Sequence, residues 1–202
     1  MKPRLLDLFC GAGGCSVGYH RAGFDVVGVD IEDHPDYPFA LVRADALEVL
    51  ADEAFLAGFD VIHASPPCQH YAPVTRWRGS SDTHPDLLPI VRQRLIDHGA
   101  PWVIENVPGS PMRVDYLLCG SMFGLRVRRH RWFEVSHHTY ALLPPCDHRN
   151  LLPFMHKNER AYTDALGCPW MTVKDGRDAV PPAYAQHIGE QLLAHLAAEG
   201  VA

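Results

Sequence analysis

Apolar residues in the first half of the chain come in short runs that alternate with segments of helical spacing. This pattern predicts strands at residues 5–9, 26–30, 60–64 and 102–106, and helices at residues 15–22, 46–57 and 85–98. Short apolar runs between helices are typical of a parallel sheet whose two faces are both covered. We therefore expect an α/β fold with a doubly wound, mostly parallel sheet of the Rossmann-like type.

The pattern changes after about residue 135. Residues 137–163 are rich in Pro, His and Asn and show little periodicity. Such a segment is typical of a loop or a small subdomain, and the helical spacing resumes at residues 183–198. We therefore expect a small irregular insertion before a final helix.

Composition and charge narrow the possible classes of protein. The chain has 202 residues, of which 47% are hydrophobic, and this suffices for one sizeable core. Its formal net charge of −6 argues against a protein that coats nucleic acid by bulk electrostatics, but it is compatible with a local basic groove. Basic runs occur at residues 126–131 and around Trp77, between Arg76 and Arg78, and a solvated face explains either run equally well.

The sequence also predicts the cellular compartment and the redox state of the cysteines. No apolar run approaches the roughly 20 residues that cross a bilayer, and the N-terminus does not resemble a signal sequence, so we expect a cytoplasmic protein without a membrane partner. The six cysteines lack the dense spacing of a secreted disulfide scaffold, so reduced thiols are expected.

A glycine-rich turn follows the first predicted strand, where Asp-Leu-Phe-Cys-Gly-Ala-Gly-Gly occupies residues 7–14. Glycines here allow a nucleotide or nucleoside to approach closely, although tight packing of a helix on a strand needs small residues too. Asp30 ends the next strand, where a carboxylate can hydrogen-bond ribose hydroxyls. Phe9 is placed to cover an adenine, and Asp45 either accepts a hydrogen bond from an adenine amino group or caps a helix.

Two prolines stiffen the loop before Cys68, in the sequence Pro-Pro-Cys-Gln at residues 66–69. Open α/β folds place active sites at this edge of the sheet, so we expect a presented nucleophilic thiol. Glu105 lies at the end of the next predicted strand. It is either a proton donor at the same edge of the sheet or an exposed residue at a strand end. Arg129 and Arg131 alternate along a predicted strand, which points both side chains one way, toward a phosphate or a carboxylate.

Taken together and in this order, these motifs resemble those of the DNA (cytosine-5) methyltransferase family. The motifs are the glycine turn at residues 7–14, Pro-Pro-Cys-Gln at 66–69, Glu-Asn-Val at 105–107 and Arg-His-Arg at 129–131. The resemblance covers most of residues 4–135 and resumes more weakly at residues 179–182. It implies an S-adenosylmethionine-dependent methyltransferase that methylates carbon 5 of cytosine in DNA.

The resemblance also implies roles for individual residues. Cys68 would attack carbon 6 of a flipped-out cytosine, while Glu105 holds and protonates the ring nitrogen. Arg129 and Arg131 would hold the base and the backbone near Cys68. The residues implied for S-adenosylmethionine are Phe9, Gly11, Gly13, Asp30, Ile31, Asp45, Ala46 and Pro66. Those implied for the substrate are Gln69, Asn106 and Arg76.

The chain departs from the family in two places. Members usually carry a large target-recognition domain before the closing segment, whereas about forty residues separate Arg131 from Met171 here. Arg177 and Asp178 stand where the closing segment usually has Gly-Asn. We expect a cofactor-binding and catalytic domain at residues 1–135, a reduced target-recognition insertion at 136–170, and a segment completing the catalytic domain at 171–202. A partner protein for target recognition and a restriction-modification role both fit this organisation.

Other functions remain compatible with these residues. One is pyrimidine modification in RNA or in a free nucleotide, and another is transfer of a different group from a modified cofactor. A third is a catalytically silent DNA-binding or regulatory subunit, although the intact Cys68, Glu105 and arginines argue against it.

We expect no metal ion. The candidate ligands in the irregular segment are Cys146, His148, His156 and Cys168, with His137 or His138. The spacing Cys-x-His is not a standard structural zinc pairing and the other intervals are long, so surface residues or DNA contacts explain the histidines better. Cys10, Cys15 and Cys119 are expected to pack inside helices or strands.

Overall fold

A seven-stranded sheet organises the protein, seen here in a computed structural model that describes residues 2–72, 75, 77, 79, 83–137 and 142–200. The strands are β1 (Arg4–Leu8), β2 (Asp25–Asp30), β3 (Ala40–Arg43), β4 (Val61–Ala64), β5 (Trp102–Asn106), β6 (Tyr116–Leu118) and β7 (Arg131–Val135). Their order is β3-β2-β1-β4-β5-β7-β6. The first five strands are parallel, and β7 runs antiparallel to both β5 and β6. The predicted α/β fold with a mostly parallel, doubly wound sheet is confirmed.

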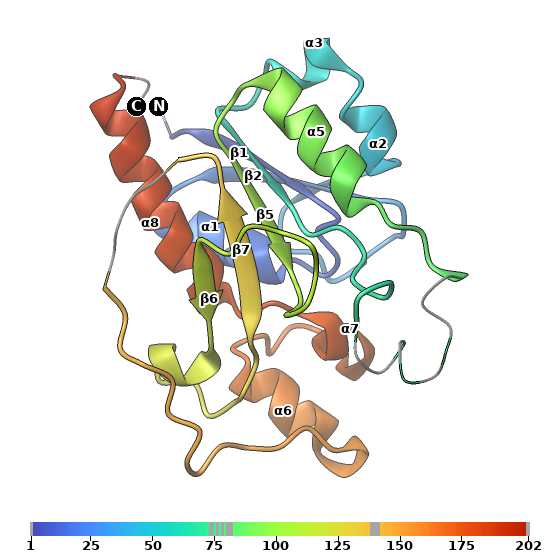
Figure 1. Ribbon diagram of the computed structural model, residues 1–202, viewed down its shortest axis with the longest axis vertical. Coiled ribbons are helices and arrows are strands. Elements are labelled where there is room, and N and C mark those ends of the chain that lie inside the picture. The colour runs from blue at the N-terminus through green and yellow to red at the C-terminus, as the bar shows by residue number, and fades with distance from the viewer. Residues whose placement is uncertain are drawn as a thin grey trace.

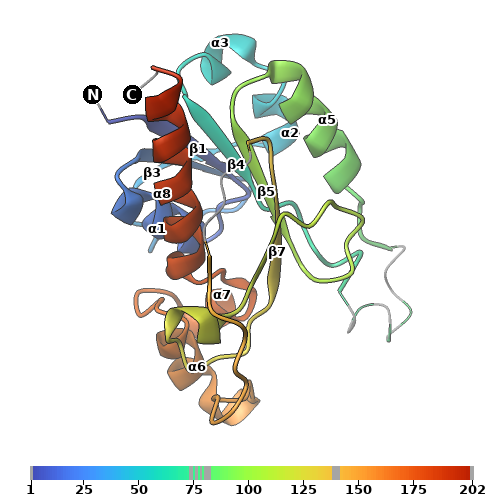
Figure 2. The ribbon, with the colours of Figure 1, turned by 60° about the vertical axis from the view of Figure 1, so that its left-hand side comes forward.

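Helices cover both faces of this sheet. The α-helices are α1 (Gly14–Ala22), α2 (Ala46–Val49), α3 (Glu53–Leu56), α5 (Leu88–His98), α6 (Glu159–Ala165), α7 (Val173–Asp178) and α8 (Pro182–Ala198). Two 3-10 helices are η2 (Gly120–Phe123) and η3 (His156–Asn158). Figures 1 and 2 show α1 and α8 on one face and α2, α3 and α5 on the other. Each face therefore buries its own apolar core.

The final helix illustrates how spacing produces this packing. Tyr184, Ile188, Leu192 and Leu196 recur every four residues along α8, and all four are buried against α1 and the sheet. Small residues let the two helices approach closely, since a Cβ built on Gly18 would lie 2.2 Å from the carbonyl oxygen of Pro182. The predicted C-terminal helix thus packs back on the first helix of the chain.

Two predicted helices have different bounds in the structure. Residues 46–57 form two short helices, because Asp52 starts a second one by accepting a hydrogen bond from the Phe55 backbone N–H at 3.0 Å. The helix predicted from residue 85 begins at Leu88 instead. Pro89 is tolerated only in the first turn of a helix, and this fixes the start.

The segment predicted as an irregular insertion is partly ordered. It contains η3 and α6, and a third apolar cluster joins it to the sheet domain. That cluster includes Ala12 from the glycine turn together with Tyr162, Leu166 and Met171. Figures 1 and 2 show α6 and α7 beyond the edge of the sheet at which β5 ends. Among the described residues, none of the helices has the length and apolarity to cross a membrane.

Candidate active site at the carboxyl edge of the sheet

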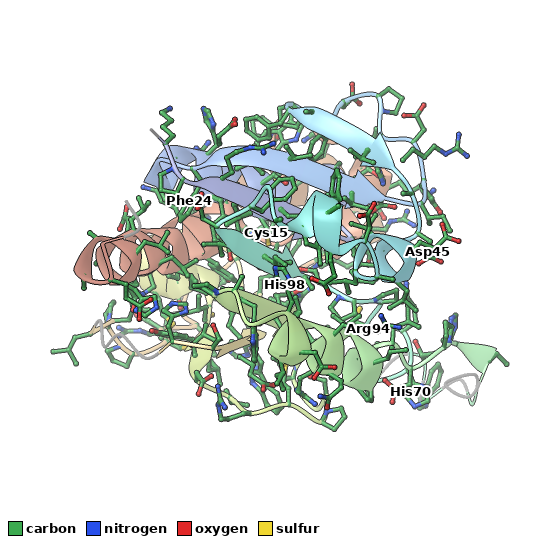
Figure 3. The ribbon with its side chains drawn as sticks, turned by 90° about the horizontal axis from the view of Figure 1, so that it is seen from above. Cys15, Phe24, Asp45, His70, Arg94 and His98 are labelled. Carbon is green, nitrogen blue, oxygen red and sulfur yellow. The ribbon has the colours of Figure 1, made fainter. Side chains whose placement is uncertain are left out.

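The register of the parallel strands brings the predicted motifs to one edge. Leu8 pairs with Ala64, and Ala64 pairs with Ile104, so the loop after β4 and Glu105 of β5 lie at the same level. Figure 3 shows Asp45 and His70, which follow β3 and β4, on one side of the molecule and Phe24, which precedes β2, on the opposite side. The carboxyl ends of the strands therefore share a common edge, as open α/β folds arrange their active sites.

The glycine turn after β1 has a backbone that few residues adopt. Gly11 and Gly13 have φ values of 51° and 87°, and Phe9 has a φ of 59°, which is uncommon for an aromatic residue. A Cβ built on Gly11 would point into open space, with no atom within 4 Å. The Gly11 backbone N–H donates to Asp30 Oδ2 at 2.9 Å, so the carboxylate at the end of β2 holds the turn. The strained turn leaves room beside it for a ligand.

Other predicted cofactor residues follow β2 and β3, the two strands that lie to one side of β1 in the sheet. Ile31 follows Asp30 and is 65% exposed, so its side chain is accessible to a ligand. Asp45 caps α2, because its Oδ1 accepts a hydrogen bond from the Leu47 backbone N–H at 2.7 Å. Of the two roles predicted for Asp45, the helix cap is confirmed and the contact with an adenine stays a prediction. Ala46 is buried in the first turn of α2.

A buried acid, Asp7, lies behind the turn in β1. Ser16 donates its hydroxyl hydrogen bond to Asp7 Oδ2, and Tyr37 donates to Ser16 Oγ at 2.9 Å. Burial raises the pKa of the Asp7 carboxyl to about 7, and the charges of Asp30 and Glu105 raise it further against the opposing Ser16 hydrogen bond. The protonated and ionised forms of Asp7 are therefore populated about equally at neutral pH.

The loop that carries Cys68 is held by backbone hydrogen bonds. Asn106 Nδ2 donates to the carbonyl oxygen of the buried Pro66 at 2.9 Å, which ties the loop to the end of β5. The carbonyl of Cys68 accepts from the backbone N–H groups of Tyr71 and Ala72, each at 2.9 Å. The Cys68 side chain itself is only partly buried. The loop therefore presents the thiol instead of packing it in the core.

Glu105 and Arg131 form a buried ion pair across β5 and β7. Arg131 Nε lies 2.8 Å from Glu105 Oε1, and both side chains are at least nine-tenths buried. Burial raises the pKa of the Glu105 carboxyl, and the charge of Arg131 partly opposes this rise. The two residues meet because antiparallel pairing sets Glu105 opposite Phe133, and Arg131 is on the same face of β7 as Phe133. A carboxyl group with a raised pKa is suited to proton transfer.

Charges from three segments act on the Cys68 thiol. Burial raises its pKa and the negative charge of Glu105 raises it further, whereas Arg131 and Arg129 lower it. Asp178, at the end of α7, also raises the Cys68 pKa. The predicted nucleophile, acid and arginines are therefore close enough to interact electrostatically.

Arg129 lies before β7 and not on it. The sequence predicted that Arg129 and Arg131 alternate along one strand, whereas β7 begins at Arg131. Its Nη2 donates to the carbonyl of Arg177 at 2.6 Å and its Nε to that of Ala179 at 3.2 Å. Burial, followed by repulsion from Arg131, lowers the pKa of Arg129 to about 10. These two hydrogen bonds connect the closing segment to Arg129 of the Arg-His-Arg motif.

Two predicted substrate residues stay predictions, and one contact was not predicted. Arg76 is outside the described residues, and Gln69 is exposed on the turn after Cys68. Trp170 was not predicted, yet its Nε1 donates to the carbonyl of Ala12 in the glycine turn at 2.8 Å. A tryptophan at the end of an irregular segment was the one signal available for this contact.

Comparisons with known proteins agree with the geometry. A family model described as C-5 cytosine-specific DNA methylase matches residues 3–110. Type II methyltransferase M.XorII of Xanthomonas oryzae pv. oryzae is 32% identical over 146 residues, covering 65% of this chain and 31% of that protein. Type II methyltransferase M.FnuDI of Fusobacterium nucleatum is 34% identical over 86 residues, covering 39% of this chain and 24% of that protein. The chain spans about a quarter to a third of the length of these relatives.

A solved structure shares the fold. The Entamoeba histolytica methyltransferase EhMeth matches with a TM-score of 0.50 at 16% sequence identity, over 82% of this chain and 65% of that one. The α/β architecture therefore extends to a structure of low sequence identity.

Proposed function

The chain belongs to the C-5 cytosine-specific DNA methylase family, and we propose that it transfers a methyl group from S-adenosylmethionine to carbon 5 of cytosine in DNA. The observation that carries this proposal is the meeting of Cys68, Glu105 and Arg131 at one edge of the sheet. A thiol beside a buried acid and a fixed cation suits covalent attack coupled to proton transfer.

The proposed reaction begins with a cytosine flipped out of the duplex, because a thiol cannot reach its ring inside the stack. The Cys68 thiolate forms a bond to carbon 6, while Glu105 gives a proton to the ring nitrogen, and carbon 5 becomes nucleophilic. Carbon 5 then takes the methyl group, which S-adenosylmethionine would supply with S-adenosylhomocysteine as the leaving group. A base removes the carbon-5 proton, the ring nitrogen returns its proton to Glu105, and elimination releases the Cys68 thiolate. Arg131 keeps Glu105 in place and, with Arg129, favours the thiolate.

The residues at the glycine turn fit S-adenosylmethionine, which would supply an electrophilic methyl group when bound. A buried carboxylate oxygen behind the turn, Asp7 Oδ1, accepts no hydrogen bond within the described residues. An unpaired acceptor suits a ligand that carries a sulfonium and an ammonium group. We assign Phe9, Gly11 and the other predicted residues of this pocket to the cofactor, because the open space beside Gly11 leaves room for it. Ala46 and Pro66 are buried at the same edge.

Residues 136–170 are proposed as a reduced target-recognition region, between a catalytic domain at residues 1–135 and a closing segment at 171–202. A cavity of about 410 Å³ supports this assignment, since Arg128 and His148 contribute polar groups to it beside an apolar wall. The wall is formed by Leu151, Leu152, Pro153, Phe154 and Tyr162. A second chain that completes target recognition, within a restriction-modification system, is compatible with this small region.

One experiment tests the reaction and its substrate. The protein is incubated with labelled S-adenosylmethionine and duplex DNA, RNA or dCTP in turn, and the modified nucleoside is identified after digestion. We expect 5-methylcytosine in the DNA sample. Label confined to RNA or dCTP would replace the proposed substrate, and the absence of label from every sample would contradict the proposed activity.

Variants test the two proposed catalytic groups. Cys68→Ser should abolish transfer, whereas Cys168→Ala, which alters a buried cysteine of the third apolar cluster, should retain it. Glu105→Gln keeps the shape but loses the acid, and we expect a loss of roughly 10²–10⁴-fold in rate. Duplex DNA with 5-fluorocytosine should become covalently attached to Cys68, because fluorine cannot leave as the proton does. A normal rate for Cys68→Ser would refute covalent attack.

A further inference from the structure

Four metal-ligating side chains meet away from the proposed active site. Sulfur and nitrogen atoms of Cys119, His130, Cys146 and His148 all lie within 4.8 Å of one another. Cys119 is buried, His130 and Cys146 are half-buried and His148 is exposed, so the group lies just under the surface. The sequence predicted no metal ion, because the Cys-x-His spacing of Cys146 and His148 is not a standard structural zinc pairing and the other intervals are long. The structure brings Cys119 and His130 beside these two residues.

The residues left out of the group have other surroundings. Cys168 is fully buried in the third apolar cluster, and His137 stacks on His195 with ring centroids 5.1 Å apart. His138 and the side chain of His156 are outside the described residues. Cys119 was expected to be a packing residue and is buried, but its sulfur faces the two histidines and the second cysteine.

The spacing of the ligand atoms is close to that of a tetrahedral zinc site. Zn–S bonds of about 2.3 Å and Zn–N bonds of about 2.0–2.1 Å place sulfur and nitrogen about 3.6 Å apart in a tetrahedron. Cys119 Sγ lies 3.6 Å from His148 Nε2, and Cys146 Sγ lies 3.7 Å from His130 Nε2. The rings of the two histidines are 5.0 Å apart and tilted by 55°, so they are not stacked face to face.

A neighbouring residue hydrogen-bonds to one member of the group, as residues around a metal site commonly do with the metal's ligands. Ser121 Oγ donates to Cys119 Sγ at 3.5 Å, and the same oxygen accepts from the Asp147 backbone N–H at 3.1 Å. Ser121 thus connects the turn after β6 with the loop that carries Cys146 and His148. That loop, residues 142–150, contains no helix or strand.

We propose that Cys119, His130, Cys146 and His148 bind a structural zinc ion. Two thiolates and two imidazoles in a tetrahedral arrangement are a ligand set that zinc favours. All four positions are supplied by the protein, so the site is closed to substrate and its role is to fasten a loop. The ligands come from three separate segments, and the ion therefore cross-links the start of the proposed recognition region to the sheet domain.

The position of His130 gives the site a consequence for the catalytic edge. His130 lies between Arg129 and Arg131, the residues that contact the closing segment and Glu105. A metal bond to His130 fixes the backbone at the residue between these two arginines. Zinc occupancy therefore stabilises the folded protein and restrains both arginine side chains.

Metal content tests the proposal directly and without any measurement of methyl transfer. The protein is produced in zinc-supplemented medium, purified with a phosphine reductant and no chelator, and analysed by inductively coupled plasma mass spectrometry. We expect one zinc ion per chain and a lower melting temperature after the ion is removed by a strong chelator. Replacement by Co²⁺ should give the intense visible absorption of a tetrahedral thiolate site. A metal content far below one per chain, or a weak octahedral cobalt spectrum, would overturn the proposal.

Variants identify the ligands. Cys146→Ser and His148→Ala should each lose most of the bound zinc, whereas Asp147→Asn, at an exposed residue between the two ligands, should keep it. If a ligand variant does not fold, the cobalt spectrum of the unaltered protein still decides the question. Full zinc content in both ligand variants would contradict the assignment. A disulfide between Cys119 and Cys146 in the reductant-purified protein, detected by mass, would also contradict it.

Discussion

Replacing Asp7 by Asn should change how the stability of the protein depends on pH. The Asp7 carboxyl is fully buried, and Nε2 of the neighbouring His63 lies 4.0 Å from Asp7 Oδ1. Burial lowers the pKa of His63 to about 3, so its imidazole is neutral at physiological pH and does not balance the charge of an ionised Asp7. The amide in the Asp7→Asn variant would keep an oxygen to accept the hydrogen bond from Ser16 and would never carry the charge.

The size of the effect follows from the pKa difference. The Asp7 pKa rises from 3.8 to about 7, and at 1.36 kcal/mol per pH unit this is about 4 kcal/mol. Because the folded-state value is the higher one, the folded protein binds more protons than the unfolded chain between about pH 4 and 7. This contribution to stability is full below about pH 4 and is lost as the pH rises through about 7. About 3 kcal/mol of it disappears between pH 5 and 8.5.

The assay is urea unfolding of the unaltered protein and of Asp7→Asn at pH 5 and at pH 8.5. The free energy of unfolding of the variant, relative to the unaltered protein, should increase by about 3 kcal/mol from the lower to the higher pH. Comparing the two proteins at each pH cancels the titration of all other groups. Asp97→Asn, which changes an exposed carboxylate on α5, controls for the loss of a charge. A variant that tracks the unaltered protein at both pH values would refute a raised Asp7 pKa.

Three further predictions test other parts of the structure. Asp178→Asn removes a negative charge near Cys68, so the Cys68 pKa should fall. Alkylation of Cys68 by iodoacetamide, measured by peptide mass spectrometry, should then be faster at neutral pH. An unchanged rate would show that Asp178 does not act on the thiol. Gly14→Ala should lower the free energy of unfolding in urea by about 1–3 kcal/mol, because the added Cβ would lie 2.3 Å from the carbonyl oxygen of Val180. An unchanged free energy of unfolding would mean that the closing segment is packed differently. Leu196→Ala, at a fully buried position of α8, should cost about 2–5 kcal/mol, and a calorimetric melting temperature equal to that of the unaltered protein would contradict this burial.

The sequence by itself determined the parallel strands β1, β2, β4 and β5 and the edge at which their motifs lie. Apolar runs of strand length between helices are local patterns, and each strand's carboxyl end is fixed once the strands are parallel. For this reason the sequence alone places Asp30, Cys68 and Glu105 at one edge. The glycine turn could also be predicted from the sequence, because glycine readily adopts positive φ values such as those of Gly11 and Gly13.

Only the tertiary structure decided which side chains meet across that edge. The Glu105–Arg131 ion pair depends on β7 pairing antiparallel with β5, and the effect of Asp178 on Cys68 depends on how α7 docks. The group formed by Cys119, His130 and the Cys146 loop is the clearest case, since its spacing along the chain matches no standard zinc motif. Ion pairs, pKa shifts and metal coordination depend on distances through space and on burial, and a linear pattern of residues contains neither.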